Sequence, residues 1–255
     1  MASERVLMVI ADIGGYTRFM RVHKINLAHA QYVVTQLMEA ILDALGRRWK
    51  LAKLEGDAAF VYRRLGDGEP LDGGELRRRV LDIAGAFRAR QAQLAAERTC
   101  ACDGCMQAGQ LTLKFVAHAG EALFHRVKRM TELAGVDVIL VHRLLKNSVP
   151  IDEYVLCSDE VHRHLAAELS APAVPIEEDL EGLGARRLYY VDLAQLGPIE
   201  LPAAPRSRLR AVLRWLHMTV RSLPYMVGLR RPPLDAEALA AICPPGEELA
   251  PAREA

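Results

Sequence analysis

The order of apolar and polar positions predicts a chain that begins with a buried strand and an amphipathic helix. Residues 5–11 are aliphatic and largely β-branched, as in a strand buried on both faces, and the run ends at Asp12. The Gly14-Gly15 pair after it indicates a tight turn. From Asn26, a helix N-cap residue, apolar side chains recur at helical spacing to about residue 48.

The same pattern predicts alternating strands and helices over the next 145 or so residues. Two short strands are predicted at about 50–55 and 58–63, and their junction at Gly56-Asp57 predicts a hairpin. The further predicted elements are a helix at 75–97, a strand at 111–118, a hairpin turn at Gly120 with a return strand at 121–127, a helix at 135–147, a strand at 153–157, a helix at 158–167 and a strand at 186–193. This order favours an α+β fold with a ferredoxin-like, antiparallel-rich sheet and helices on one face.

The C-terminal quarter has a different pattern. We expect one domain over 1–195, a proline-rich linker over 196–206, and an amphipathic helix with a flexible tail over 207–255. Within the last segment, 207–223 combines an apolar stripe with a basic face. Such a helix either packs on the domain or across a dimer, or makes peripheral contact with an anionic membrane.

Composition and charge narrow the class of protein. The chain has 255 residues, of which 51% are hydrophobic and 25% charged, as in folded globular proteins. Lys plus Arg is 33 against 32 Asp plus Glu, so no basic field indicates a nucleic-acid partner. The first apolar run is too short for a signal peptide, and no run reaches the roughly 18 residues of a membrane span. We therefore expect a cytoplasmic protein with reduced thiols.

Two aspartates are the strongest candidates for chemistry. Asp12 and Asp57 end or join neighbouring predicted strands, and adjacent strand ends bring two carboxylates within reach of one ion. Hard oxygen ligands with room for phosphate suit Mg²⁺ or Mn²⁺. The backbone N–H groups of Gly14, Gly15 and Tyr16, which lead into a helix, could cradle a phosphate. Judged by spacing alone, turn aspartates beside glycines fit equally well without any ligand.

In combination, these motifs resemble class III adenylate and guanylate cyclases. The segments that carry the resemblance, in order over about residues 5–193, are ADIGGYTRF at 11–19, KLEGD at 53–57, VAHAGEA at 116–122 and GVDVILVHRL at 135–144. More closely, the chain resembles a bacterial family of uncharacterised cyclase-like proteins, DUF2652. That family has a Cys-x-Cys-x-x-Cys loop before an LKF strand, and a VHRLLKN helix.

The resemblance implies roles for individual residues. Asp12 and Asp57 match the two metal ligands, and Lys53 matches the base-selecting lysine of adenylate cyclases. Glu132 falls where those enzymes place a second base-selecting acid. Arg143 matches the arginine that steadies the triphosphate in the transition state, supplied from the partner chain of a homodimer.

Two positions depart from the cyclase pattern. The asparagine that orients the ribose is Ile139 here, which has no hydrogen-bonding group, although the nearby His142 is a conceivable replacement. The phosphate-binding lysine of the last hairpin falls near Leu183, where Arg186 or Arg187 could reach the same place. Loss of one positioning contact in phosphoryl transfer lowers the rate about 100-fold or more.

Three cysteines form a second candidate metal site. Cys100, Cys102 and Cys105 supply three thiolates, and a tetrahedral Zn²⁺ needs four ligands, the fourth being His118 or Cys157. Free loop thiols and redox-sensing thiols are the alternatives.

Three functions follow as hypotheses. The first is a phosphorus–oxygen lyase that converts ATP to cyclic AMP and pyrophosphate by attack of the ribose 3′-hydroxyl, with Mg²⁺ or Mn²⁺ at a homodimer interface. The second is a degenerate module that binds a nucleoside triphosphate or dimerises without turnover, as Ile139 favours. The third is a zinc-stabilised structural partner protein.

Overall fold

The computed structural model describes residues 3–22, 27–66, 68–96, 108–128 and 130–201. The chain divides into a unit of residues 1–205 and a unit of residues 206–255. The second unit, with the helix predicted at 207–223, and the cysteine loop at 99–106 lie outside the described residues. Within them, no helix has the length and apolar character needed to cross a membrane.

One sheet organises the domain. Its strands are β1 (Ser3–Gly14), β2 (Lys50–Glu55), β3 (Ala58–Arg64), β4 (Thr112–Val127), β5 (Met130–Ala134), β6 (Tyr154–Ser158), β7 (Val174–Leu180) and β8 (Gly184–Asp192). Their order is β2-β3-β1-β4-β6-β8-β7, and β5 pairs with the far end of β4. Only the β4–β6 pairing is parallel among these strands. The α+β, antiparallel-rich prediction is confirmed.

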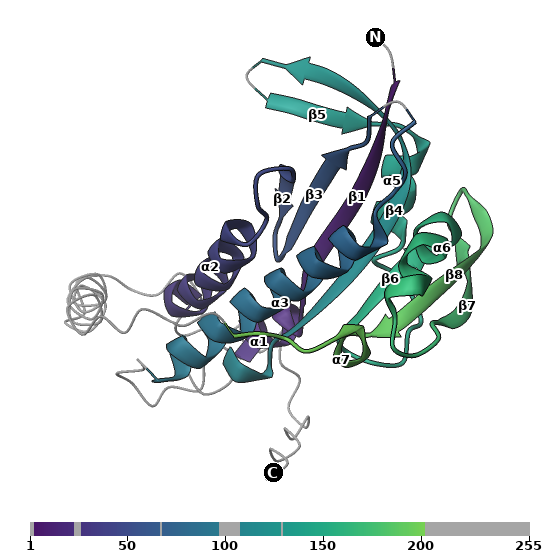
Figure 1. The fold of residues 1–255 in the computed structure, drawn as a ribbon. Helices are drawn as coiled ribbons and strands as arrows, with labels where there is room; N and C mark the ends of the chain where they lie inside the picture. Colours follow the sequence, from purple (N-terminus) through teal and green to yellow (C-terminus); the bar gives the residue numbers. More distant parts are fainter. Residues whose placement is uncertain (1–2, 23–26, 67, 97–107, 129, 202–255) are drawn as a thin grey trace. The chain divides into compact units, whose positions relative to one another are not determined.

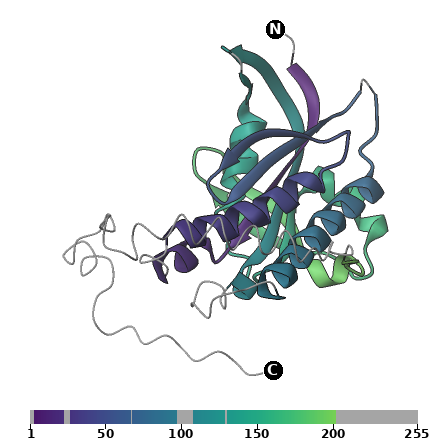
Figure 2. The ribbon, with the colours of Figure 1, turned by 90° about the vertical axis from the view of Figure 1, so that its left-hand side faces the viewer.

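Helices cover both faces of the sheet, whereas the sequence pattern predicted them on one. The helices are α1 (Tyr16–Val22), α2 (Leu27–Asp43), α3 (Gly73–Ala96), α5 (Val136–Arg143), α6 (Asp159–Leu165) and α7 (Leu193–Leu196), with short 3₁₀ turns η2 (Ala108–Gln110) and η3 (Ala166–Glu168). Figures 1 and 2 show α2 and α3 side by side across one face, where α6 also packs. Helix α5 packs in a separate core on the opposite face.

This two-sided cover explains the apolar first strand. β1 lies between β3 and β4, and Leu7 and Val9 face α2 and α3 while Met8 and Ile10 face the α5 side. All four side chains are buried. A strand covered on both faces gains from apolar residues at every position, so no alternation appears. Asp12 is the first ionisable residue after this run and continues the α5 side.

The hairpin predicted at Gly120 does not exist. β4 runs straight through Gly120, which pairs with Val6 of β1, and the chain turns at Lys128, whose φ is 55°. The glycine has another purpose, because the carboxylate of Asp137 in α5 occupies the space that a Cβ would need. A glycine within a strand marks a close approach as readily as a turn.

Strand β7 is absent from the sequence prediction, which has no strand between residues 168 and 185. It contains Pro175 and three acidic residues, a poor strand signal, and it lies at the edge of the sheet, where proline is tolerated. Its Glu178 and Glu177 lie opposite Arg186 and Arg187 of β8.

The residues after α7 remain on the domain surface. Arg77 Nε of α3 donates to the carbonyl of Leu196 at 2.5 Å, and Ile199 packs against the core. Gly85 of α3 lets the carbonyl of Glu200 approach closely. The first half of the predicted linker is therefore in contact with α3.

Candidate functional site

The two predicted carboxylates meet at one end of the sheet. Asp12 pairs in register with Ala58 of β3, directly after Asp57, and the Ile13 amide donates to the Asp57 carbonyl at 3.1 Å. On the other side, Asp12 lies opposite Lys114 of β4, whose Nζ is 3.1 Å from Asp12 Oδ2. The β2–β3 turn that carries Asp57 requires Gly56 in a left-handed conformation, with φ 68°.

The two carboxylates lie close enough for one to affect the ionisation of the other. Burial, and then the negative charge of Asp12, raise the pKa of Asp57, while a backbone hydrogen bond at Asp57 and, after it, the charge of Lys114 oppose the shift. The Asp12 side chain is only 16% exposed, so water screens the pair weakly. Two carboxylates and one ammonium leave a net negative charge in a partly desolvated corner, which favours a divalent cation.

The protein contribution to such an ion is small. No group of three or more His, Cys, Asp and Glu side chains in the described part of the chain could hold a metal. Mg²⁺ is commonly bound by one or two carboxylates, with water and substrate phosphate completing its octahedron. Asp12 and Asp57 therefore fit an ion whose remaining positions are filled by water or phosphate oxygens, and do not fit a closed protein cage.

The predicted phosphate cradle forms a turn between β1 and α1. Gly14 ends β1 and packs against Thr112 so closely that a Cβ would collide with Thr112 Oγ1. Gly15 has φ 80°, and Tyr16 begins α1, where the Phe19 amide donates to the Gly15 carbonyl at 2.9 Å. Both glycines are required by local geometry, and a phosphate role for their amides stays a prediction.

Lys53 lies next to an acid that sequence analysis did not single out. Its Nζ is 3.9 Å from Glu55 Oε1, and the same oxygen is 3.2 Å from His142 Nε2. The His142 ring also packs edge-on against Phe60, with centroids 4.8 Å apart. Glu55 thus connects the strand before Asp57 to helix α5.

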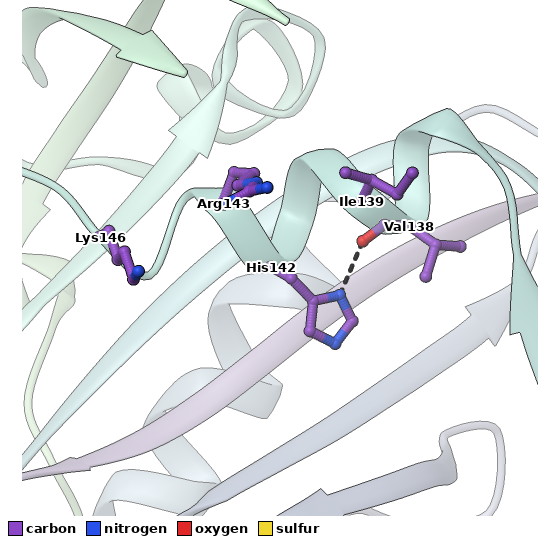
Figure 3. Close-up of a pocket in the computed structure, with 5 residues that line it drawn as sticks. All are labelled: Val138, Ile139, His142, Arg143 and Lys146. Atoms are coloured by element: carbon purple, nitrogen blue, oxygen red, sulfur yellow. Dashed lines mark hydrogen bonds between the residues drawn. The ribbon is translucent and has the colours of Figure 1, made fainter. Parts of the chain in front are cut away.

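Arg143 faces an acid of its own chain. Its Nη1 is 2.5 Å from Glu181 Oε2, in the turn between β7 and β8. The outer surface of α5 has a hollow of about 300 Å³, lined by Val138, Ile139, His142, Arg143 and Lys146, and Figure 3 shows His142 and Arg143 directed to different sides of the helix. Ile139 is 52% exposed there. The structure brings Asp12 and Asp57 together but gives Arg143 a separate partner.

The family model described as "Protein of unknown function (DUF2652)" matches residues 34–154. The uncharacterised protein Rv2561/Rv2562 of Mycobacterium tuberculosis is 39% identical over 200 residues, which are 78% of this chain and 91% of the relative. The chain belongs to the DUF2652 family.

Solved cyclase domains share the fold of this DUF2652 protein. A bacterial light-regulated adenylyl cyclase superimposes with a TM-score of 0.56 at 14% identity, covering 86% of this chain and 100% of that one. The catalytic core of a rhodopsin-guanylyl cyclase of converted specificity, in complex with ATPαS, has a TM-score of 0.52 at 14% identity and covers 74% and 96%. The predicted cyclase-like fold is confirmed, and at this identity the likeness concerns the fold alone.

Two further residues named by the cyclase resemblance lie apart from the carboxylates in sequence and in register. Glu132 of the DUF2652 chain is on β5, opposite His125 of β4, and is half-buried. Leu183, at the lysine position, packs against the core on the α5 face. Alternation along β8 places Arg186 on that face, while the Arg187 guanidinium is 5.6 Å from the ring of Tyr189. Of these two arginines, Arg186 is therefore the one on the same face as Leu183.

The proposed fourth zinc ligands have other roles in this DUF2652 chain. Cys157 is fully buried, which raises the pKa of its thiol to about 12, and it donates to the Tyr189 carbonyl. A thiol that stays protonated is a poor zinc ligand. His118 faces the α5 side of the sheet, whereas α3 and η2, which flank the cysteine loop, pack on the opposite side. Both ring nitrogens of His118 already have hydrogen-bond partners.

The zinc site itself remains a prediction. Protein purified without added metal should contain about one zinc per chain, since three clustered thiolates bind Zn²⁺ tightly at neutral pH. Cys102→Ser should lower that content in elemental analysis, whereas Cys243→Ser, outside the cluster, should not. Wild-type protein without zinc would leave the free-thiol and redox alternatives.

Sequence analysis missed Lys114, Glu55 and Glu181. Lys114 stands between the buried Leu113 and Phe115, and a charged residue inside an apolar strand is a usable signal. Its partner, however, depends on the β1–β4 register. Glu55 and Glu181 carry no comparable signal, because their partners come from distant parts of the chain.

Proposed function

We propose that the chain binds a nucleoside triphosphate with Mg²⁺ or Mn²⁺ at Asp12 and Asp57, and that a homodimer converts ATP to cyclic AMP and pyrophosphate. The observation that carries the proposal is the carboxylate pair at adjacent strand ends, which is partly buried and has Lys114 as a cationic neighbour. A bound divalent ion would activate the 3′-hydroxyl and neutralise phosphate charge. The fold shared with a cyclase core crystallised with ATPαS supports the same ligand class.

Lys114 is proposed to contact first the carboxylates and then the phosphate of the nucleotide. In the free chain its ammonium serves as counter-ion to Asp12. Once the carboxylates share a divalent ion, Lys114 is no longer needed in that role. Its ammonium would then be available to bind a phosphate group, for which it is a suitable point-charge partner.

Lys53 and Glu132 are the proposed readers of adenine. Lys53 is 56% exposed and its weak pairing with Glu55, at 3.9 Å, leaves the ammonium available to a base. ATP is accordingly the favoured nucleotide. The assay that decides this is purified protein with Mn²⁺ and each of the four nucleoside triphosphates, monitored for pyrophosphate and for cyclic product.

Dimerisation is proposed from the outer surface of α5. Val136 and Ile139 are 64% and 52% exposed and lie three residues apart, so they share one side of the helix that carries Arg143. Arg143 pairs with Glu181 and would be released to a triphosphate held by the carboxylates of a second chain. Apolar residues around such an arginine suit an interface between two copies.

A nucleotide-binding regulatory module without turnover is the second candidate. Ile139 at the ribose position and Glu181 as the partner of Arg143 both favour it, because neither assists transition-state charge. Binding without any pyrophosphate release in the four-nucleotide assay would select this function. Membrane contact through 207–223 remains a prediction about residues beyond those described.

The metal ligands can be tested by stability. Mn²⁺ at 100 times its dissociation constant should raise the melting temperature by about 5–10 °C, because a ligand of the native state alone stabilises it. Asp57→Asn should abolish this shift. The same substitution should also raise the melting temperature of the metal-free protein at neutral pH, because it removes the ionised Asp57 carboxylate.

A raised pKa in the folded state means that stability falls as pH rises from the ordinary value of 3.8 through the folded value. At neutral pH the ionised Asp57 therefore destabilises the metal-free fold in full, and the neutral amide removes that effect. Asp152→Asn, an exposed turn position, is the control for loss of one charge. An Asp57→Asn chain that still responds to Mn²⁺ would contradict the assignment.

A further inference from the structure

A hydrogen-bonded chain of His118, Asp137 and Ser158 fills a gap in the sheet. β4 pairs with β6 as far as Ala117 and with β5 from Leu123 onward, so none of the described strands pairs with residues 118–122 on that side. Across this gap, His118 Nδ1 lies 2.9 Å from Ser158 Oγ, and His118 Nε2 lies 3.1 Å from Asp137 Oδ1. The other Asp137 oxygen accepts the Glu121 amide at 2.7 Å.

The local sequence is adapted to this chain of contacts. Gly120 leaves room for the Asp137 carboxylate, as no other residue would. Ser158 stands at the N-cap of α6, where serine usually accepts a hydrogen bond from the first turn, yet it makes no such bond and directs its hydroxyl to His118 instead. The His118 residue is only 8% exposed, and buried polar groups are costly unless their partners are complete.

We infer that His118, Asp137 and Ser158 are positioning residues that fix the start of α5 on β4 and thereby set where His142 and Arg143 lie. Asp137 precedes Arg143 by six residues, a helical rise of about 9 Å, so a shift at the helix start is transmitted to both side chains. Apolar packing of Val138 and Val141 holds the helix on the sheet. It does not fix the helix along its axis as directed hydrogen bonds do. This inference rests on the proposed function.

The test compares Ser158→Ala and Asp137→Asn with Asp152→Asn as the matched charge control. Ser158→Ala removes the hydroxyl, and Asp137→Asn leaves one oxygen to serve two donors. Amide hydrogen exchange within α5 should become about 3–10 times faster in both, the effect expected from one lost hydrogen bond. Ser158→Thr, which keeps a hydroxyl, should restore slow exchange.

A second readout separates positioning from general stability. The nucleotide 3′-deoxy-ATP lacks the attacking hydroxyl, so its binding can be measured without turnover. In the presence of Mn²⁺, its affinity should fall about 3–10-fold in Ser158→Ala and Asp137→Asn. The Mn²⁺ melting shift without nucleotide should persist, because Asp12 and Asp57 lie on other elements. Ser158→Thr should recover the affinity.

Two results would overturn the inference. One is α5 exchange in Ser158→Ala and Asp137→Asn equal to that in Asp152→Asn. The other is faster exchange with unchanged nucleotide affinity, which would make the contacts structural only. A wild-type protein that does not bind the nucleotide at all would contradict the proposed function itself. That result would also contradict the positioning role, which depends on the proposed function.

Discussion

Chains with Asp57→Ala and chains with Arg143→Ala, each inactive alone, should regain about a quarter of wild-type activity when mixed in equal amounts. Asp57→Ala removes a ligand of the proposed metal ion and Arg143→Ala removes a charge contact to the triphosphate, and such losses lower turnover about 100-fold or more. If the proposed site takes its carboxylates from one chain and Arg143 from the other, a mixed dimer keeps one complete cleft. Random pairing makes about half of the dimers mixed, each with one of two clefts intact.

The structure supports this division of the site. Asp12 and Asp57 are neighbours across β1 and the β2–β3 turn, whereas Arg143 is directed to Glu181 of the β7–β8 turn. Both carboxylates therefore belong to the same half of a cleft. A mixture of Asp12→Ala with Asp57→Ala chains is the matched control and should show no recovery. In the proposed site both carboxylates of a cleft come from one chain, and every chain in this mixture lacks one of them.

Sedimentation and the product assay together decide the outcome. Recovery in the first mixture and none in the control supports a shared active site. The regulatory module is supported if the chain is dimeric, the wild type binds nucleotide but releases no pyrophosphate, and the mixture shows no activity. A wild-type chain that stays monomeric at about 100 μM, well above micromolar dissociation constants, would contradict both and leave the structural-partner hypothesis.

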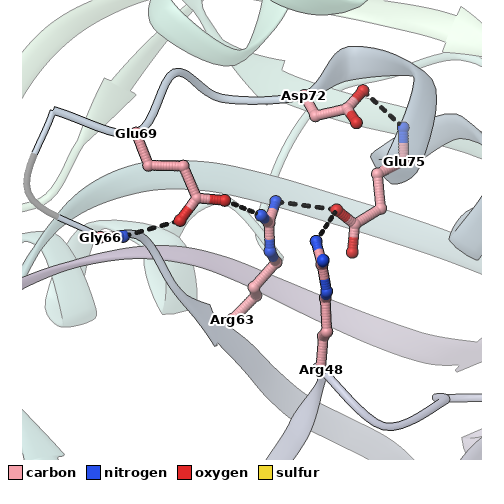
Figure 4. Close-up of polar contacts among 6 residues, drawn as sticks. All are labelled: Arg48, Arg63, Gly66, Glu69, Asp72 and Glu75. Atoms are coloured by element: carbon pink, nitrogen blue, oxygen red, sulfur yellow. Dashed lines mark hydrogen bonds and ion pairs between the residues drawn. The ribbon is translucent and has the colours of Figure 1, made fainter.

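Replacing Arg63 with methionine should destabilise the protein by about 2–3 kcal/mol. This is less than the cost of breaking a fully buried ion pair, because Glu69, one of the two partners of Arg63, is exposed. Arg63 is 4% exposed and makes ion pairs with Glu69 and with Glu75, whose oxygen is 3.0 Å from Nη1. Figure 4 shows Arg48 approaching the same Glu75 carboxylate. Methionine fills much of the volume but leaves the half-buried Glu75 without its nearest cation.

The next residue is a matched control. Arg64 points to the opposite face of β3, pairs with Glu4, lies over the Phe124 ring and is 47% exposed. Exposed pairs contribute about 0–1 kcal/mol, so Arg64→Met should change stability little. Urea unfolding of both variants measures the difference. Equal stability would contradict a structural role for Arg63.

The Arg63 effect should also depend on pH. The Gly66 amide and then Arg63 lower the pKa of Glu69 from its ordinary value of 4.5. A lowered carboxyl pKa contributes stability that is present above the ordinary value and lost as pH falls through the folded one. The difference between wild type and Arg63→Met should therefore shrink below about pH 4.5.

Part of the candidate site followed directly from local sequence. Two local patterns mark the carboxylates: the apolar run that ends at Asp12, and the hairpin turn at Gly56-Asp57. Asp12 lies on β1, Asp57 lies directly before β3, and these two strands pair with each other. Local chain geometry therefore sufficed to predict that the two carboxylates meet. The same reasoning failed at Gly120, because a glycine required by Asp137, 17 residues later, looks identical to one required by a turn.

The sequence by itself determined the α+β class, the positions of most strands and helices, and the proximity of Asp12 to Asp57, because these depend on side-chain periodicity and on short-range turns. Only the tertiary structure decided that Lys114 neutralises Asp12, that Glu181 holds Arg143, and that His118 joins Asp137 to Ser158. Each of these contacts joins residues from different elements through strand register or helix docking. Register and docking are set by the packing of both cores together, which no single segment of the chain encodes.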